Sequence, residues 1–158
     1  MIIRLLLAAV VTAALLAVST PAISAAAVER SDATLERQAE ELSDRLERMV
    51  AADDPTEHAS ARLVATLRLP GRSLTSAGVS QVRFRHRSGV GLVTWQVGAT
   101  HRGSRVLVDA ALRAVGNPLV LRRAGPHRLS FELEGSEHHP VVTVQRLGGP
   151  QPTEAANG

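Results

Sequence analysis

The chain lacks cysteine, lysine and tyrosine. Without cysteine it has no disulfide, no thiolate metal site and no cysteine nucleophile. Aromatic residues make up only 2% of the 158 residues, namely Phe84, Trp95 and Phe131. The core must therefore consist mainly of valine, leucine and alanine, and no aromatic platform is present on which nucleic-acid bases could stack. The length suits one domain with accessory segments, which excludes a multidomain enzyme.

Residues 1–28 carry a single charge, Arg4, ahead of an apolar run and a stretch of small residues. This order is typical of a secretory signal peptide, with suitable cleavage bonds after Ser24, Ala26 and Ala27. The same uncharged segment also suits a retained membrane anchor, and both alternatives stay open. Both place everything after Glu29 outside the membrane, so we expect an exported protein that is extracellular or anchored to the cell membrane.

The formal net charge of +3 hides two oppositely charged segments. Residues 29–57 contain ten acidic and four basic side chains, whereas residues 58–158 contain five acidic and thirteen basic ones. All 18 basic residues are arginines. We therefore expect electrostatics between these two parts, or toward partners, to govern association.

The pattern of residues 29–54 predicts an acidic amphipathic helix. Apolar residues recur at steps of four and three, which aligns one apolar stripe along a helix: Leu35, Ala39, Leu42, Leu46 and Met49. Ser31 is the expected N-cap, and Pro55 disfavours helical geometry at Asp54. Glu41–Arg45 and Asp44–Arg48 are spaced for ion pairs. Another apolar surface must cover this stripe. The alternatives are the chain's own β domain, a second copy and another envelope protein.

Beyond a linker at residues 55–60 the hydrophobic period changes from 3.6 to 2, which indicates strands. Seven short strands separated by glycine and proline turns predict a β domain over residues 61–147, either an antiparallel immunoglobulin-like sandwich or a small barrel. One strand places Arg83, Arg85 and Arg87 on a single face. Residues 148–158 lack apolar content and are expected to be a disordered tail. The predicted fold is thus mainly β, preceded by a hydrophobic N-terminal helix and the acidic helix.

Two stretches carry a resemblance to a known family. Leu119 to Leu133, LVLRRAGPHRLSFEL, is similar to the final hairpin of immunoglobulin-like extracellular domains, and Leu67 to Val79 reads LRLPGRSLTSAGV. With the hydrophobic N-terminus and the acidic helix, the chain resembles a family of small uncharacterised haloarchaeal membrane-anchored or exported proteins encoded beside type IV pilus-like secretion ATPase genes. This resemblance implies an accessory or pseudopilin-like component of a surface appendage or secretion apparatus, with no catalytic residues to carry over.

The sequence gives little support to catalysis. The six histidines lack the spacings of a metal site, and no nucleophile elbow or phosphate-binding glycine pattern occurs. We therefore predict no catalytic, metal-binding or cofactor-binding residues, no cofactor, no nucleic-acid partner and no small-molecule substrate. An alternative is a secreted ligand-binding or hydrolytic β domain, working through the neighbourhood of His138, His139, Glu132, Glu134 and Glu137.

The favoured hypothesis is a noncatalytic cell-envelope accessory protein. It would lie at the membrane with its N-terminus and dock on envelope proteins, or on itself, through the acidic helix and the basic β surface. The residues predicted to bind these partners are Leu35, Leu42, Leu46, Met49, Arg83, Arg85 and Arg87.

Overall fold

The computed structural model describes residues 2–52, 61–116, 118–136 and 139–148. Within these ranges it contains one helix, α1 (Ile2–Ala52). The strands are β1 (Arg62–Leu69), β2 (Arg72–Ser73), β3 (Ser76–Ala77), β4 (Val79–Arg87), β5 (Val90–Val97), β6 (His101–Val108), β7 (Ala111–Ala114), β8 (Val120–Leu121), β9 (Gly125–Ser136) and β10 (His139–Leu147). The predicted linker at 55–60 and all but the first residue of the predicted tail lie outside the described residues.

The strands form two four-stranded sheets with the orders β1-β9-β10-β7 and β6-β5-β4-β8, and β2 and β3 form a small hairpin. All pairs are antiparallel except β7 and β10, which run parallel. The prediction of a mainly β, antiparallel fold is confirmed at this level. The expected number of seven strands is too low, because two-residue strands such as β2 and β3 are too short to show an alternating pattern.

The two sheets share one core in which the aliphatic residues surround a single aromatic contact. Phe84 of β4 and Phe131 of β9 meet edge to face across the sheets, with ring centroids 6.0 Å apart. Alternation along the strands produces this core, since every second residue of β5 from Gly91 to Val97 and of β9 from His127 to Leu133 is buried. The scarcity of aromatics is thus met by valine and leucine packing, as the composition indicates.

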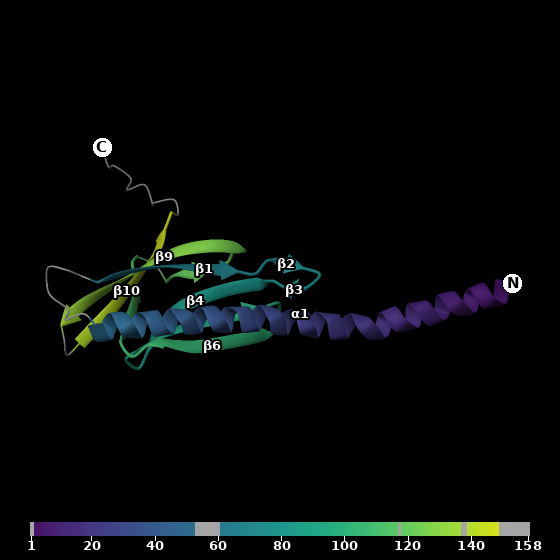
Figure 1. Cartoon of the computed structure of the whole chain (residues 1–158), viewed down its shortest axis with the longest axis horizontal. Helices are drawn as coiled ribbons and strands as arrows, with labels where there is room; N and C mark the ends of the chain where they lie inside the picture. Colours follow the sequence, from purple (N-terminus) through teal and green to yellow (C-terminus); the bar gives the residue numbers. More distant parts are fainter. Residues whose placement is uncertain (1, 53–60, 117, 137–138, 149–158) are drawn as a thin grey trace.

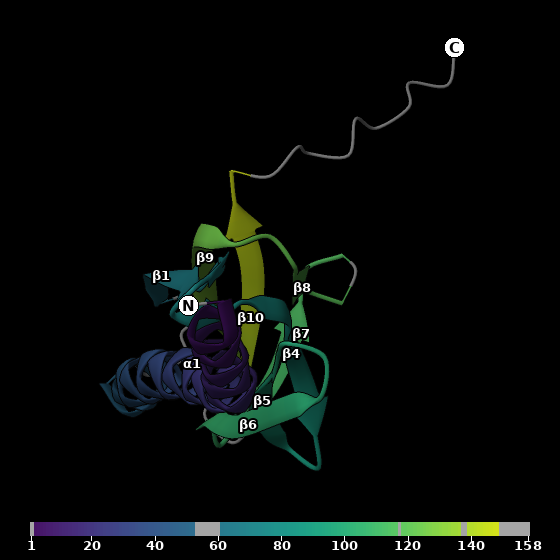
Figure 2. The ribbon, with the colours of Figure 1, turned by 90° about the vertical axis from the view of Figure 1, so that its right-hand side faces the viewer.

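Helix α1 closes the open side of this sandwich. Figure 2 shows it between β1, an edge strand of the first sheet, and β6, an edge strand of the second. The N-terminal part of α1 extends beyond the strands, whereas its C-terminal part runs alongside them (Figure 1). A single helix therefore belongs to the β domain over one half and projects from it over the other.

The continuity of α1 corrects the predicted N-cap. Ser31 lies inside the helix and is buried, and its Oγ donates a hydrogen bond to the Ala27 carbonyl at 3.0 Å. The same oxygen accepts from the Ala77 backbone N–H at 3.2 Å and contacts Ser76 Oγ at 2.9 Å. The alanines at 25–27 favour helix, so the chain continues through the expected boundary and Ser31 bonds back by four residues instead.

Within the described ranges, no helix combines the length and apolarity that crossing a bilayer requires.

Candidate interaction surfaces

The predicted docking stripe of α1 is covered by the chain itself. Leu35, Leu42, Leu46 and Met49 are 2%, 5%, 0% and 9% exposed and belong to the same core as the sheets. Of the three alternatives for what covers this apolar stripe, the structure shows the chain's own β domain. These four side chains are consequently not a free surface for a separate partner, and the hypothesis that they dock one is corrected.

Polar contacts fix α1 to β5 and β6. The Trp95 indole Nε1 donates to Asp32 Oδ1 at 2.6 Å, and His101 Nε2 lies 3.1 Å from Asp32 Oδ2. Further along the helix, Arg105 donates to Glu40 at 3.0 Å and Ser43 Oγ donates to the Leu107 carbonyl at 3.0 Å. Part of the acidic charge of the helix is therefore neutralised within the chain.

On the opposite flank, side chains of α1 occupy the free edge of β1. The Gln38 amide donates to the Arg68 carbonyl at 3.0 Å and accepts from the Arg68 N–H at 2.7 Å, as a neighbouring strand would. Arg45 donates to the Val64 carbonyl at 3.0 Å. Exposed strand edges invite pairing with other chains, so these contacts protect β1 from edge-to-edge association.

The prediction of ion pairs along the helix is wrong. Among the described residues, neither Glu41–Arg45 nor Asp44–Arg48 forms an ion pair. Arg45 turns to β1, as above, and Arg48 Nε donates to the Asp44 carbonyl at 3.0 Å. The backbone acceptors compete successfully because an exposed pair of this kind contributes only about 0.3 to 0.5 kcal/mol.

The arginines of β4 project from the outer surface of the sheet, as predicted. Arg85 and Arg87 are exposed and Arg83 is half-buried, while Val82 and Phe84 on either side of Arg83 face the core. Arg102 of β6 joins Arg83 and Arg85 around a hollow of about 400 Å³, together with Gln81, Gln96 and Ser104. We call Arg83, Arg85, Arg87 and Arg102 the arginine face. Sequence reasoning missed Arg102, which only strand pairing places beside the others.

The arginine face has no counter-charge among the residues that the structure describes. No acidic residue occurs between Glu57 and Asp109 in the sequence, so β4, β5 and β6 contain no carboxylate. Among the described residues, none of its four arginines forms an ion pair. The Nε of Arg83 is in addition buried with no hydrogen-bond partner among them, an arrangement that is energetically unfavourable unless something completes it.

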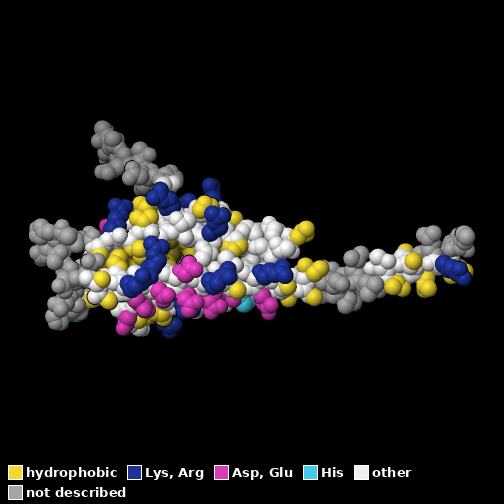
Figure 3. Space-filling model, viewed as in Figure 1, with side chains coloured by type: hydrophobic (Ala, Val, Ile, Leu, Met, Phe, Trp, Pro, Cys, Tyr) yellow, Lys and Arg dark blue, Asp and Glu magenta, His cyan; other side chains and the backbone are white. Residues whose placement is uncertain are grey.

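An acidic ridge runs along the exposed side of α1. It consists of Glu29, Glu36, Asp44 and Glu47, all exposed, with Glu40 in the same row but paired to Arg105. Figure 3 shows acidic side chains in a row along the helix. Positions 29, 36 and 47 fall on one side of a helix with 3.6 residues per turn, so their carboxylates line up over about 27 Å.

A second hollow, of about 830 Å³, lies where α1 leaves the domain. Ile23 and Ala27 of the helix form one wall, and the segment around β2 and β3 with Arg72 forms another. Leu74, at the turn of this hairpin, is 91% exposed. In the sequence, this hollow is marked only by a leucine within a turn of small polar residues. That pattern is too weak to predict a surface.

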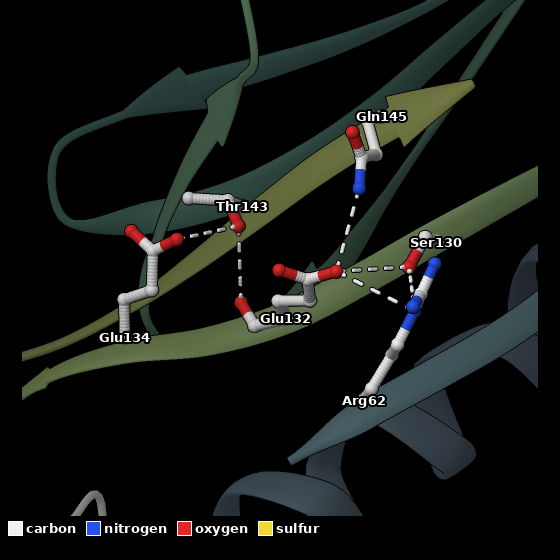
Figure 4. A network of polar contacts seen from close by, with 6 residues as sticks. All are labelled: Arg62, Ser130, Glu132, Glu134, Thr143 and Gln145. Carbon is white, nitrogen blue, oxygen red and sulfur yellow. Dashed lines mark hydrogen bonds and ion pairs between the residues drawn. The ribbon is translucent and has the colours of Figure 1, made fainter. Parts of the chain in front are cut away.

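The carboxylates of the alternative hydrolytic site are engaged in the sheet surface (Figure 4). Glu132 Oε1 lies 3.4 Å from Arg62 Nε and accepts from Gln145 at 3.3 Å, while Glu134 accepts from Thr143 at 3.2 Å. Glu137 and His138 lie outside the described residues. Among those described, no three histidine, aspartate or glutamate side chains gather as metal ligands would. Glu132 and Glu134 are therefore paired with side chains of the neighbouring strands β1 and β10.

Comparison with known proteins assigns the chain to a family. A family model described as a domain of unknown function, DUF7311, matches residues 2–147, which covers both the helix and the sandwich. The chain therefore belongs to the DUF7311 family. Neither the curated proteins nor the solved structures contain a match.

Proposed function

We propose that this protein is a noncatalytic accessory subunit of the cell envelope, a pseudopilin-like component of a type IV pilus or secretion system. In this proposal it is exported, its N-terminal helix half lies at the membrane, and its sandwich is the immunoglobulin-like head. The observation that carries the proposal is the division of α1 into a half that is buried in the domain and a half that projects from it (Figure 1).

The projecting half presents large apolar side chains to the surroundings. Ile3, Leu6, Leu7, Val10 and Val11 are 50% to 82% exposed. Their positions repeat at intervals of three and four, so they form one stripe on the helix. Such a stripe is unfavourable in water and suits contact with lipid or with the same stripe of neighbouring copies. This supports an assembly role over that of a free secreted domain.

The continuous helix also favours a retained segment over a cleaved signal peptide. Cleavage after Ser24, Ala26 or Ala27 would cut α1 within its helical span. Ala27 is 6% exposed and its carbonyl accepts the hydrogen bond from Ser31. Removing residues up to Ala27 would therefore withdraw a contact that the domain uses.

Site-specific crosslinking tests the assembly role, because the chain has no native cysteine. Val10→Cys should give a covalent dimer on mild oxidation of membranes, since we expect the apolar stripes of neighbouring copies to touch. Arg113→Cys, also exposed but on β7, is the matched control and should stay monomeric. Equal, low crosslinking of both variants, with the protein in the soluble fraction, would refute assembly through the helix.

Gene deletion in the host tests the pilus assignment. Loss of the gene should reduce surface filaments or protein secretion, and the wild-type gene should restore them. A Leu7→Glu/Val10→Glu variant should fail to restore them, whereas Leu74→Glu, a matched change at an exposed leucine of the head, should succeed. A deletion strain with unchanged filaments and secretion contradicts the assignment.

A further inference from the structure

We propose that the arginine face of one copy binds the acidic ridge on α1 of a second copy. This inference rests on the proposed assembly function and names the contact between the heads. It is carried by two surfaces of opposite charge on the same chain, each of which is left largely unneutralised by the chain's own fold.

The arginine face requires an anionic partner from outside its own sheet. Arg83, Arg85 and Arg102 surround one hollow, and the sequence from residue 58 to residue 108 contains no carboxylate. The Nε of Arg83 is buried and has no hydrogen-bond partner among the described residues. A carboxylate entering the hollow would supply both a counter-charge and an acceptor for arginine N–H groups.

Among the described residues, no ion pair joins the acidic ridge to the arginine face of the same molecule. Helix α1 lies along the β6 edge, where its contacts go to inward-pointing residues such as His101 and Arg105. The arginine face points outward, because its side chains alternate with the buried Val82 and Phe84. Among the described residues, Glu29, Glu36, Asp44 and Glu47 form no ion pair within the chain, so their charge is available to another molecule.

The second copy fits the arginine face better than a free anion does. The ridge offers several carboxylates in one line, and the face offers several guanidinium groups over neighbouring strands, so multiple charge pairs form in one docking event. Both surfaces lie on every copy. The contact consequently leads either to a closed pair, in which each ridge meets the other's face, or to an open chain of copies.

A charge-reversal experiment on the full chain in detergent tests this contact. The first variant is Arg83→Glu/Arg85→Glu, and the second is Glu36→Arg/Glu47→Arg. Each alone should lose self-association by a factor on the order of 100 in sedimentation or light scattering, because like charges then meet. An equimolar mixture of the two should associate again, since each contact regains opposite charges. Arg113→Glu/Arg146→Glu, which changes the charge equally at two exposed sites outside the face, should associate like the wild type.

Rescue in the mixture supports the proposal, whether the product is a pair or a longer chain. Absence of rescue, or equal association of all variants, overturns it. Loss of binding to vesicles of anionic lipid by the Arg83→Glu/Arg85→Glu variant, without any change in self-association, also overturns it and assigns the face to lipid. Crosslinking through Val10→Cys does not depend on these charges, so the failure of this inference remains distinguishable from failure of the proposed function.

Discussion

Replacing Leu46 with alanine should destabilise the whole sandwich. Leu46 lies on the acidic helix, yet it is 0% exposed and belongs to the core shared with both sheets. Truncating a fully buried leucine removes its transfer free energy and leaves a cavity, and such changes lower the free energy of unfolding by about 3 to 5 kcal/mol. For a domain of this length we expect the melting temperature to fall by roughly 6 to 20 °C.

Urea unfolding followed by the fluorescence of Trp95 measures this change. Trp95 is the only tryptophan, and its indole donates to Asp32 of α1, so its signal reports whether the helix is seated on the sheet. Leu74→Ala is the matched control, because Leu74 is 91% exposed, and it should change the free energy of unfolding by no more than about 0.5 kcal/mol. If Leu46→Ala unfolds at the same urea concentration as this control, the helix is not part of the core and the argument fails.

Three further changes test individual contacts. Gly103→Ala should lower the free energy of unfolding by about 1 to 3 kcal/mol and alter the near-ultraviolet signal of Trp95, because the added methyl carbon would overlap the indole ring of Trp95. An unchanged spectrum would contradict this packing. Gln38→Ala should speed hydrogen exchange at the Arg68 amide and lower the free energy of unfolding by about 1 kcal/mol. Unchanged exchange would mean that Gln38 does not protect the edge of β1. Asp32→Ala should lower the free energy of unfolding by about 1 to 3 kcal/mol, and Asp32→Asn should lower it by less, since asparagine retains an acceptor for the indole. If urea unfolding shows that both variants lose the same free energy of unfolding, that hydrogen bond is excluded.

Local periodicity was sufficient to predict much of the architecture. The repeat from Leu35 to Met49 predicted the buried side of the helix, and alternation in β4 predicted which side Arg83 and Arg85 would occupy. Both predictions depend only on the geometry of one element. The helix N-terminus was missed for the same reason, because Ser31 has the residue type of a cap and only its tertiary contacts with Ser76 and Ala77 reveal its role inside α1.

The partner of an amphipathic stripe is not a local property. A row of leucines requires an apolar cover, but every one of the three alternatives would bury it equally well. What distinguishes the chain's own sandwich is the polar fit on either side, where Gln38 pairs with the backbone of β1 and Ser43 with the backbone of β6.

Those two edges belong to different sheets, so one helix protects both of them and closes the core at the same time. This arrangement turns the remaining acidic side chains outward, away from the arginines of β4. The opposite charges that the sequence concentrates in two segments are therefore only partly neutralised by folding, through contacts such as Arg105 with Glu40. The proposed contact between copies would use the remainder, because charge complementarity favours one partner and one orientation over others.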